Sequence, residues 1–309
     1  MKNISLAIHG GAGTILKSII TRKKEQAYKN ALQAALDAGY KVLEQGGAAL
    51  DAVECSVAEL EDSHLFNAGK GSVFTASGTH EMDASIMDGS NLEAGAISAV
   101  AGIKNPVMLA RSVMEQSDHV YLSGAGAEEF ARSVNSEFRD QKYFYDEFRY
   151  QQWLAIKDSD KFQLDHSPPK ENKFGTVGAV AQDSQGNIAA ATSTGGMTNK
   201  KFGRVGDSSI IGSGTYANNQ TCAVSCTGSG EYFIRGVVAY DVSCLIEYKQ
   251  MSLEQACREV IQHRLKKIGG DGGLIALDAT GNIVLEFNTE GMYRAMKSST
   301  GTKEVGIYR

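Results

Sequence analysis

The chain has 309 residues, of which 42% are hydrophobic and 22% charged, enough for one large or two ordinary globular domains. Its formal charge of −5 is modest and gives no electrostatic footprint for nucleic acid or an anionic membrane. Composition and charge therefore argue against a nucleic-acid-binding or membrane-surface protein and indicate an ordinary globular protein with an ample core.

Five cysteines are scattered through the chain, and no metal-ligand spacing recurs among them. This usage is typical of buried, reduced thiols in a reducing compartment. The N-terminal apolar run is far too short for a signal peptide, and no run approaches membrane-spanning length. We therefore expect a cytoplasmic protein.

The first elements predicted are a strand and two helices. Ser5–Ile8 is a short apolar strand, and the glycine run His9–Gly13 behind it predicts a tight turn that lets backbone pass close to a site. Lys24–Gln45 and Leu50–Leu60 have apolar residues at helical spacing. In the first helix the expected buried face consists of Ala27, Ala31, Ala35, Ala38 and Val42.

Two further strands and two helices complete the first half. Met82–Asp88 alternates like an edge or half-buried strand, and Ala94–Gly102 is a second strand of small residues. Asn105 and Pro106 predict a helix start, because Asn caps and Pro fits the first helical position. Gly126–Val134 predicts a short helix.

A sharp change in composition separates the two halves. Residues 156–174 are polar and include two adjacent prolines, whereas an apolar, strand-like segment begins at Val177. Thr176 lies at this junction, directly after Gly175. A cut between them would give Thr176 both a hydroxyl and a free amine, which is a nucleophile with its own general base. The α-amine has a reference pKa of about 7.7–8.0, where a base is most useful.

The second half contains two similar β-hairpins separated by two helices. Val177–Ile188 and Gly273–Ile283 each have a strand, an Asp-x-x-Gly-Asn turn and a second strand. One helix is expected from Gly230 to about Tyr248, and another begins at Ser252 with a capping-box pattern. Together with the first half, this order predicts an α+β fold built in layers.

Three polar clusters follow the junction, at Thr192–Lys200, Gly203–Ser208 and Ser225–Glu231. Each has a plain structural interpretation. Thr-Gly runs form turns, Arg204 and Asp207 could be a surface ion pair of little energetic value, and Thr227–Glu231 could cap a helix.

Together with Gly175–Val180, these clusters resemble the isoaspartyl peptidase/L-asparaginase family, also called plant-type asparaginases, a branch of the N-terminal nucleophile hydrolases. Runs similar to the family's occur in order along the whole chain, at His9–Gly13, Phe66–Gly69, Met82–Ala84 and Phe287–Arg294. The chain departs from the pattern at Ser229, where many relatives carry a second threonine, and Lys70 occupies a variable loop position.

The resemblance implies a four-layer αββα sandwich formed by one domain, residues 1–309. It implies a precursor that cuts itself between Gly175 and Thr176 into 1–175, with a flexible linker at about 156–174, and 176–309. The two fragments would remain one folding unit, and two such units would pair into a heterotetramer.

The resemblance also implies hydrolysis of β-aspartyl dipeptides and L-asparagine to L-aspartate. Thr176 would attack the side-chain carbonyl, Thr194 would orient its hydroxyl, and Thr227 with the Gly228 amide would stabilise the oxyanion, with support from Asn67. Arg204 would hold the substrate α-carboxylate and Asp207 the α-ammonium. The substrate-binding residues implied are Arg204, Val205, Gly206, Asp207, Thr227, Gly228, Ser229 and Gly230.

No cofactor is expected for catalysis, although the loop from Leu60 to Lys70 resembles the family's sodium-binding loop. Its backbone-carbonyl ligands would be those of Leu60, Glu61, Ser63, Phe66, Ala68 and Lys70. Three alternatives stay open at this point: a glycosylasparaginase-like amidase, a protease of the threonine-aspartase type, and an uncleaved, inactive relative that binds an amino acid.

Overall fold

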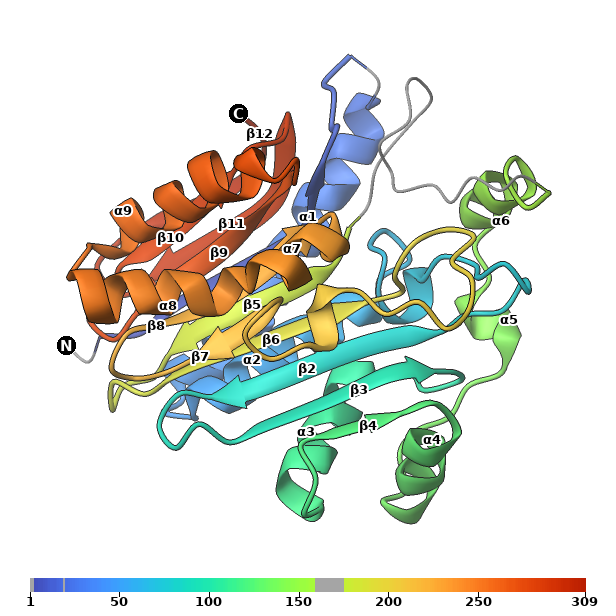
Figure 1. Ribbon diagram of the computed structural model, residues 1–309, viewed down its shortest axis with the longest axis horizontal. Coiled ribbons are helices and arrows are strands. Elements are labelled where there is room, and N and C mark those ends of the chain that lie inside the picture. Colours follow the sequence, from blue (N-terminus) through green and yellow to red (C-terminus); the bar gives the residue numbers. More distant parts are fainter. Residues whose placement is uncertain (1–2, 19, 159–174) are drawn as a thin grey trace.

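The computed structural model describes residues 3–18, 20–158 and 175–309, which form a mixed α+β fold with two β-sheets (Figure 1). The larger sheet has the order β12-β11-β1-β5-β6-β2-β3-β4, and the smaller one β10-β9-β8-β7. The strands of the larger sheet are β1 (Ser5–Gly13), β2 (Met82–Asp88), β3 (Ala94–Val100), β4 (Tyr121–Ser123), β5 (Val177–Gln182), β6 (Ile188–Thr194), β11 (Gly291–Ser298) and β12 (Lys303–Tyr308). Those of the smaller sheet are β7 (Thr215–Ala217), β8 (Cys222–Gly228), β9 (Gly272–Asp278) and β10 (Ile283–Phe287).

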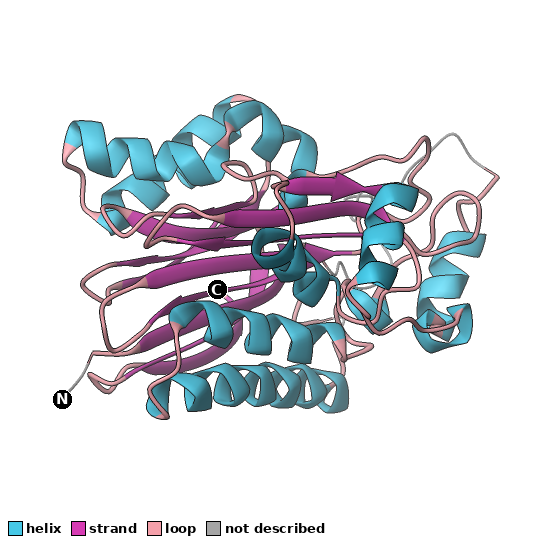
Figure 2. Ribbon diagram, turned by 90° about the horizontal axis from the view of Figure 1, so that it is seen from below, coloured by secondary structure: helices cyan, strands magenta, loops and turns pink. Residues whose placement is uncertain are grey.

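Helices lie on the two outer sides of the strands (Figure 2). Those of the first half are α1 (Arg22–Glu44), α2 (Ala49–Glu61), α3 (Pro106–Gln116), α4 (Gly124–Ser133), α5 (Gln141–Phe144) and α6 (Glu147–Leu154). Those of the second half are α7 (Gly230–Gly236), α8 (Val238–Lys249) and α9 (Leu253–Arg258), which continues as a π-helix over Glu259–Leu265. Helices α1–α3 share one hydrophobic core with the larger sheet, and α7–α9 share another with the smaller sheet.

A third core lies between the two sheets, and we call it the inter-sheet layer. In β5, Val177 belongs to the core beneath the helices, whereas Val180 belongs to the inter-sheet layer. In the same way, β8 directs Val224 toward its helices and Ala223 toward the other sheet. This alternation follows from the two-residue period of a strand, and it gives each sheet two buried faces.

Two predictions for the first half are wrong in detail. β2 is not an edge strand, because it pairs with both β3 and β6 and is buried over Met82–Met87; its alternating polar residues face the inter-sheet layer rather than solvent. The run His9–Gly13 is not a turn but the end of β1, with an irregular register between His9 and Gly11. Gly11 has φ of 111°, a backbone conformation that favours glycine.

Two helix predictions also need correction. In α1 the buried face contains Tyr28, Leu32 and Leu36, while most of the predicted alanine face is only partly buried. The larger side chains bury more apolar area against the sheet. The single helix expected over Gly230–Tyr248 is broken at Val237, which has φ of 47°. The amides of Ala239 and Tyr240 donate to the carbonyls of Ser213 and Gly212 instead of continuing α7.

The remaining predicted elements are confirmed. Both hairpins form, although β5–β6 lies in the larger sheet and β9–β10 in the smaller. Ser252 caps α9 with the predicted capping box. All five cysteines are free thiols. Within the described ranges no helix is both long and apolar enough to cross a membrane. Most of the predicted linker, residues 159–174, lies outside the described residues.

Candidate active site

Thr176 immediately precedes β5 and is only 6% exposed. The antiparallel pairing of Val177 with Ser193 carries Thr176 toward Thr194, at the end of β6. On the other side of β5, Gly178 pairs with His9 of β1. The Thr176 hydroxyl oxygen lies 3.2 Å from that of Ser208. Thr176 therefore stands directly before β5, which lies between β1 and β6 in the larger sheet.

Gly175 is enclosed by backbone from β1 and a side chain from β8. A Cβ added to Gly175 would lie 2.8 Å from Thr227 Oγ1, and a Cβ added to Gly11 would lie 2.6 Å from the Gly175 nitrogen. The Thr227 hydroxyl also accepts a hydrogen bond from the Ala12 amide at 3.3 Å. Neither glycine could gain a side chain without displacing a neighbour. This shows that the Gly175 backbone lies directly beside the Thr227 hydroxyl.

Thr194 and Asn67 organise the loop that follows β6. The Gly196 amide donates to Thr194 Oγ1 at 3.0 Å, and Asn67 Nδ2 donates to the Gly196 carbonyl at 2.7 Å. Asn67 Oδ1 accepts from the Val73 amide at 3.1 Å. Among the described residues, Thr194 makes no hydrogen bond with the Thr176 hydroxyl, so the orienting partner predicted for Thr176 differs from its observed partner, Ser208.

The end of β8 carries the predicted oxyanion donors, Thr227 and Gly228. Gly228 has φ of 154°, and a Cβ there would lie 2.4 Å from the Asp271 carbonyl oxygen. The Ser229 amide donates to the same carbonyl at 3.0 Å, and its hydroxyl donates to the Asp271 carboxylate. These contacts fix the backbone after Thr227, and Gly228 is required because the turn passes so close to Asp271.

The predicted substrate-binding residues meet at the start of α7. Arg204 holds Glu231 with two hydrogen bonds, of 2.8 Å from Nε and 3.0 Å from Nη2. A Cβ added to Gly230 would lie 2.9 Å from both Arg204 Nη2 and Asp207 Oδ1. Gly206 is buried and Val205 half-buried in the loop between these charged residues. Arg204 is thus paired with Glu231 rather than with Asp207, and the simple Arg204–Asp207 ion pair does not form.

Burial controls the charge of Asp207. It raises the pKa of this carboxyl to about 7, although the positive charge of Arg204 acts in the opposite direction. Asp207 Oδ2 has no hydrogen-bond partner among the described residues. Partial burial also raises the pKa of Glu231, but hydrogen bonding and the charge of Arg204 outweigh it and lower this pKa overall. The site therefore has an unpaired carboxyl oxygen, that of Asp207, near Arg204, which is bound to Glu231.

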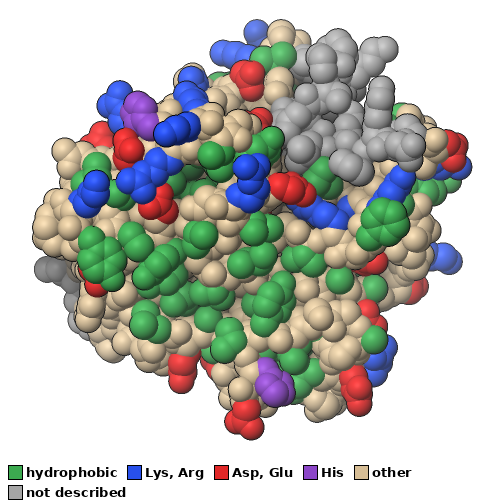
Figure 3. Space-filling model, viewed as in Figure 1, with side chains coloured by type: hydrophobic (Ala, Val, Ile, Leu, Met, Phe, Trp, Pro, Cys, Tyr) green, Lys and Arg blue, Asp and Glu red, His purple; other side chains and the backbone are tan. Residues whose placement is uncertain are grey.

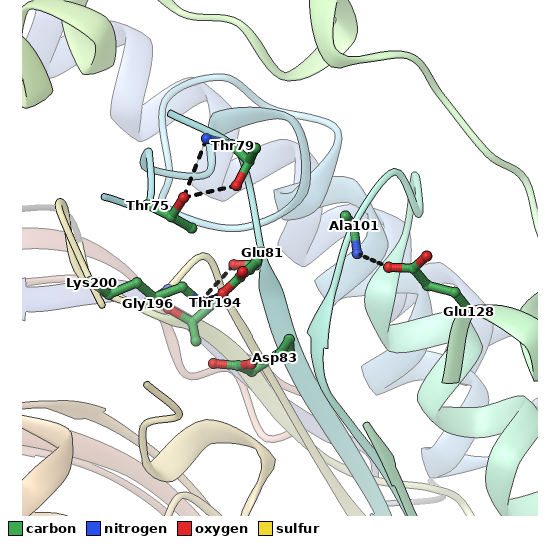
Figure 4. Close-up of polar contacts among 10 residues, drawn as sticks. Thr75, Thr79, Glu81, Asp83, Ala101, Glu128, Thr194, Gly196 and Lys200 are labelled. Atoms are coloured by element: carbon green, nitrogen blue, oxygen red, sulfur yellow. Dashed lines mark hydrogen bonds and ion pairs between the residues drawn. The ribbon is translucent and has the colours of Figure 1, made fainter. Parts of the chain in front are cut away.

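A second set of charges lies beneath Thr194 (Figure 4). Asp83 pairs in register with Thr194, is fully buried, and accepts the Ala99 amide at 2.8 Å. Its burial raises its pKa, against the opposing charge of Lys200. Lys200 runs past Gly196 and donates to the Glu81 carbonyl at 2.9 Å.

His9 is a buried hydrogen-bonding residue of β1. Its Nε2 lies 2.9 Å from Ser225 Oγ. Burial lowers the pKa of the ring to about 3, against a smaller opposite effect of hydrogen bonding to the Thr176 backbone. His9 is therefore neutral at physiological pH and contributes no charge beside Thr176.

The predicted sodium loop closes tightly on itself. A Cβ on Gly69 would lie 2.5 Å from the Glu61 carbonyl, and one on Gly71 would lie 2.0 Å from the Phe66 carbonyl. The carbonyls of Leu60 and Ala68 accept from the amides of Ser63 and Gly71, and Lys70 is the middle residue of the 3-10 turn. The carbonyls of Leu60, Phe66 and Ala68 thus all accept backbone amides within this short loop.

Sequence reasoning missed two side chains of the site, Ser208 and Glu231. Both stand inside polar clusters that were recognised, directly after Asp207 and Gly230 respectively. A serine beside a binding residue and a glutamate in the first turn of a helix have common structural explanations. Only the folded structure shows that the Ser208 hydroxyl contacts that of Thr176 and that the Glu231 carboxylate binds the Arg204 guanidinium.

The fold and this threonine-centred site agree with the family comparison. Residues 2–307 match the family described as asparaginase, and the chain belongs to this family. It is 52% identical to the isoaspartyl peptidase of Escherichia coli over 307 residues, covering 98% of this chain and 96% of the relative. It is 41% identical to the isoaspartyl peptidase/L-asparaginase of Xenopus laevis, covering 98% and 94%. Identity to the plant-type L-asparaginase of Pyrococcus abyssi is 41%, covering 98% and 100%.

Proposed function

We propose that this protein hydrolyses β-aspartyl dipeptides and L-asparagine, releasing L-aspartate, with Thr176 as an N-terminal nucleophile made by self-cleavage. The observation that carries the proposal is the Gly175–Thr176 segment, held between Gly11 and the Thr227 hydroxyl at the start of a buried strand. The names of the relatives, which include isoaspartyl peptidase and L-asparaginase, support the same reaction.

Self-cleavage would begin with attack of the Thr176 hydroxyl on the Gly175 carbonyl carbon. The acyl group moves from nitrogen to oxygen, and water then hydrolyses the ester to give a Gly175 carboxylate and a free Thr176 amine. Thr227 Oγ1, which lies beside the Gly175 backbone, would stabilise the oxyanion of this step. Gly175 carries no Cβ that would separate these groups.

Substrate hydrolysis would reuse the same groups. The Thr176 amine takes the hydroxyl proton and returns it to the leaving amine or ammonia, which leaves a β-aspartyl ester that water hydrolyses. The substrate α-carboxylate would replace Glu231 on the Arg204 fork, and the α-ammonium would pair with Asp207, whose Oδ2 is unpartnered among the described residues. Neither contact involves the leaving group, so the site would accept both asparagine and β-aspartyl dipeptides.

We infer that the fold is the four-layer αββα sandwich of the N-terminal nucleophile hydrolases and one domain over residues 1–309, cut into 1–175 and 176–309. The cores on both sides of each sheet support this arrangement. We further infer a dimer of cleaved units. Hydrophobic side chains gather on the face that carries α8 and β7 (Figure 3), where Val237, Tyr240 and Tyr248 are exposed.

Two finer assignments complete the proposal. The carbonyls of Leu60, Glu61, Ser63, Phe66, Ala68 and Lys70 would hold a sodium ion that stabilises the loop carrying Asn67. The free thiols of all five cysteines support a cytoplasmic location.

The function is tested by intact-mass analysis of the purified protein, followed by hydrolysis assays on three substrates. We expect two fragments, ammonia from asparagine, and leucine from β-aspartyl-leucine. α-Aspartyl-leucine should remain intact, because its α-carboxylate is tied up in the peptide bond and would leave Arg204 without a partner. Efficient cleavage of the α-linked isomer would contradict the substrate pose, and a single inactive chain would favour an amino-acid-binding relative.

Product binding should depend on pH through Asp207. Since burial raises its pKa to about 7, the carboxyl is largely neutral below that pH and loses its attraction for the α-ammonium. L-aspartate should therefore bind the mature enzyme about tenfold more weakly at pH 6 than at pH 8. Calorimetric titration at both pH values measures this.

The Asp207→Asn variant is the control, because its amide does not titrate. The neighbouring charged groups are Arg204, Glu231 and Asp83. A pH dependence that persists in Asp207→Asn would show that another group titrates, either Asp83, whose pKa burial also raises, or the free Thr176 amine.

A further inference from the structure

A chain of buried hydroxyl groups crosses the inter-sheet layer beside Thr176. Ser85 Oγ of β2 lies 2.8 Å from Thr215 Oγ1 of β7, which in turn lies 2.5 Å from Thr192 Oγ1 of β6. Thr192 Oγ1 lies 2.7 Å from Ser225 Oγ of β8. All four residues are fully buried, and they alternate between the larger and the smaller sheet. Thr215 and Ser225 belong to the smaller sheet.

One end of this hydroxyl chain reaches the Thr176 side chain through Ser208, and the other end reaches His9. At one end Ser85 Oγ donates to the Ser208 carbonyl at 2.6 Å, and Ser208 Oγ is 3.2 Å from Thr176 Oγ1. At the other end Ser225 bonds to His9, which lies next to the Thr176 backbone. The chain passes so close to β5 that a Cβ on Gly178 would lie 1.9 Å from Ser225 Oγ.

The steps of self-cleavage and hydrolysis given above do not use this chain. Most of the inter-sheet layer is apolar, and buried hydroxyls bring no hydrophobic stabilisation that valine or alanine would not provide. Thr215 lies nearest the Ser208 end of the chain together with Ser85, since its hydroxyl is also 3.4 Å from the Ser208 carbonyl. Thr215 thus contacts the backbone carbonyl of Ser208, and the Ser208 side chain contacts the Thr176 hydroxyl.

We propose that Ser208 Oγ is the group that orients the Thr176 hydroxyl for attack, and that Thr215 is a positioning residue that holds Ser208 in place through Ser85. The proposal rests on the proposed function, because it concerns the rate at which Thr176 reacts. Ser208 takes the place of Thr194, whose hydroxyl accepts the Gly196 amide, in the orienting role for both self-cleavage and hydrolysis. The hydroxyl chain makes no contact with the substrate groups assigned above.

The test measures Ser208→Ala, Thr215→Val and the double variant. Each single variant should slow self-cleavage and lower kcat on β-aspartyl-leucine by roughly 10- to 100-fold, because a small misplacement of a reacting group is costly. KM should stay within about twofold, since neither side chain holds the α-groups. The double variant should be no slower than Ser208→Ala, because Thr215 acts through Ser208.

Thr215→Ser keeps the hydroxyl and should restore near-normal rates. Thr221→Val is the matched control, because Thr221 is also buried and its hydroxyl pairs with Ser243 at 2.7 Å, just before β8 and at the end of that strand away from Thr227. It should cleave and turn over normally. If Thr215→Val does not fold, Ser85→Ala removes the adjacent hydroxyl with less change in shape.

Three results would overturn the positioning role: normal rates in Ser208→Ala, equal losses in Thr215→Val and Thr221→Val, or additive losses in the double variant. Each of these presumes an active wild-type protein. Failure of the proposed function is distinguishable, because the wild-type chain itself would then neither cleave nor release aspartate.

Discussion

Replacing Thr176 with alanine is expected to leave a single chain of full mass with no measurable hydrolysis of asparagine or β-aspartyl-leucine. The variant lacks the only hydroxyl assigned to attack the Gly175 carbonyl, and without cleavage no free amine arises to act as base. Loss of a covalent nucleophile typically lowers kcat by at least about 10⁴-fold. Intact-mass spectrometry and an ammonia-release assay on the same preparation measure both effects.

Thr176→Ser is the matched control, because it keeps a hydroxyl and, after cleavage, an α-amine. It should cut at the same bond and retain activity, at a lower rate because serine lacks the methyl group that restricts the side-chain rotamer of threonine. Two fragments from Thr176→Ala, cut at the Gly175–Thr176 bond, would show that another group performs the cleavage.

Replacing Arg204 with alanine is expected to leave self-cleavage intact but to lower kcat/KM on both substrates by about 10²–10⁴-fold. The estimate comes from two charge-assisted hydrogen bonds to the substrate carboxylate, each worth about 1.5–3 kcal/mol. Arg204 already holds a carboxylate, that of Glu231, in this two-bond geometry. Self-cleavage should be unaffected, because the Gly175–Thr176 segment has no free α-carboxylate for Arg204 to hold.

Arg235→Ala provides the control, since it removes an exposed arginine from the same helix that carries Glu231. It should cleave and hydrolyse normally. Hydrolysis of asparagine by Arg204→Ala at the wild-type rate would mean that Arg204 serves only its ion pair with Glu231.

Much of the fold could be predicted from the sequence because its signals are local. The Asp-x-x-Gly-Asn turns predicted both hairpins, since Asp183 and Asp278 accept hydrogen bonds from the amides of their own turns. The capping box predicted the start of α9. The break at Val237 could not be predicted, because it depends on the carbonyls of Gly212 and Ser213, which lie in a loop distant in sequence and accept from the amides that begin α8.

The residues of the site likewise fall into those predicted from the sequence and those that depend on contacts between distant segments. Thr176 was predicted from the change in composition around it, and Thr227 and Arg204 from the family resemblance of the clusters that contain them; their roles stay predictions. Ser208 was not predicted, since its contact with Thr176 depends on how the loop after Gly203 folds against the start of β5.

The buried face of α1 was also predicted wrongly. Alanine spacing along this helix fits a helical face as well as the spacing of the larger residues Tyr28 and Leu32 does. The choice between the two faces depends on which side chains fill the space above the sheet, and the sequence of the helix alone does not contain that information.

The order of strands in the larger sheet has a consequence for any attempt to make the two halves separately. β1 and β2–β4 come from residues before Gly175, whereas β5, β6, β11 and β12 come from residues after it, and the two groups interleave. Without the first half, β5 and β11 would both lose β1, and β6 would lose β2. A lone 176–309 chain would thus expose unpaired strand edges, which invite aggregation. Synthesis as one polypeptide would let these ladders form before the proposed cleavage.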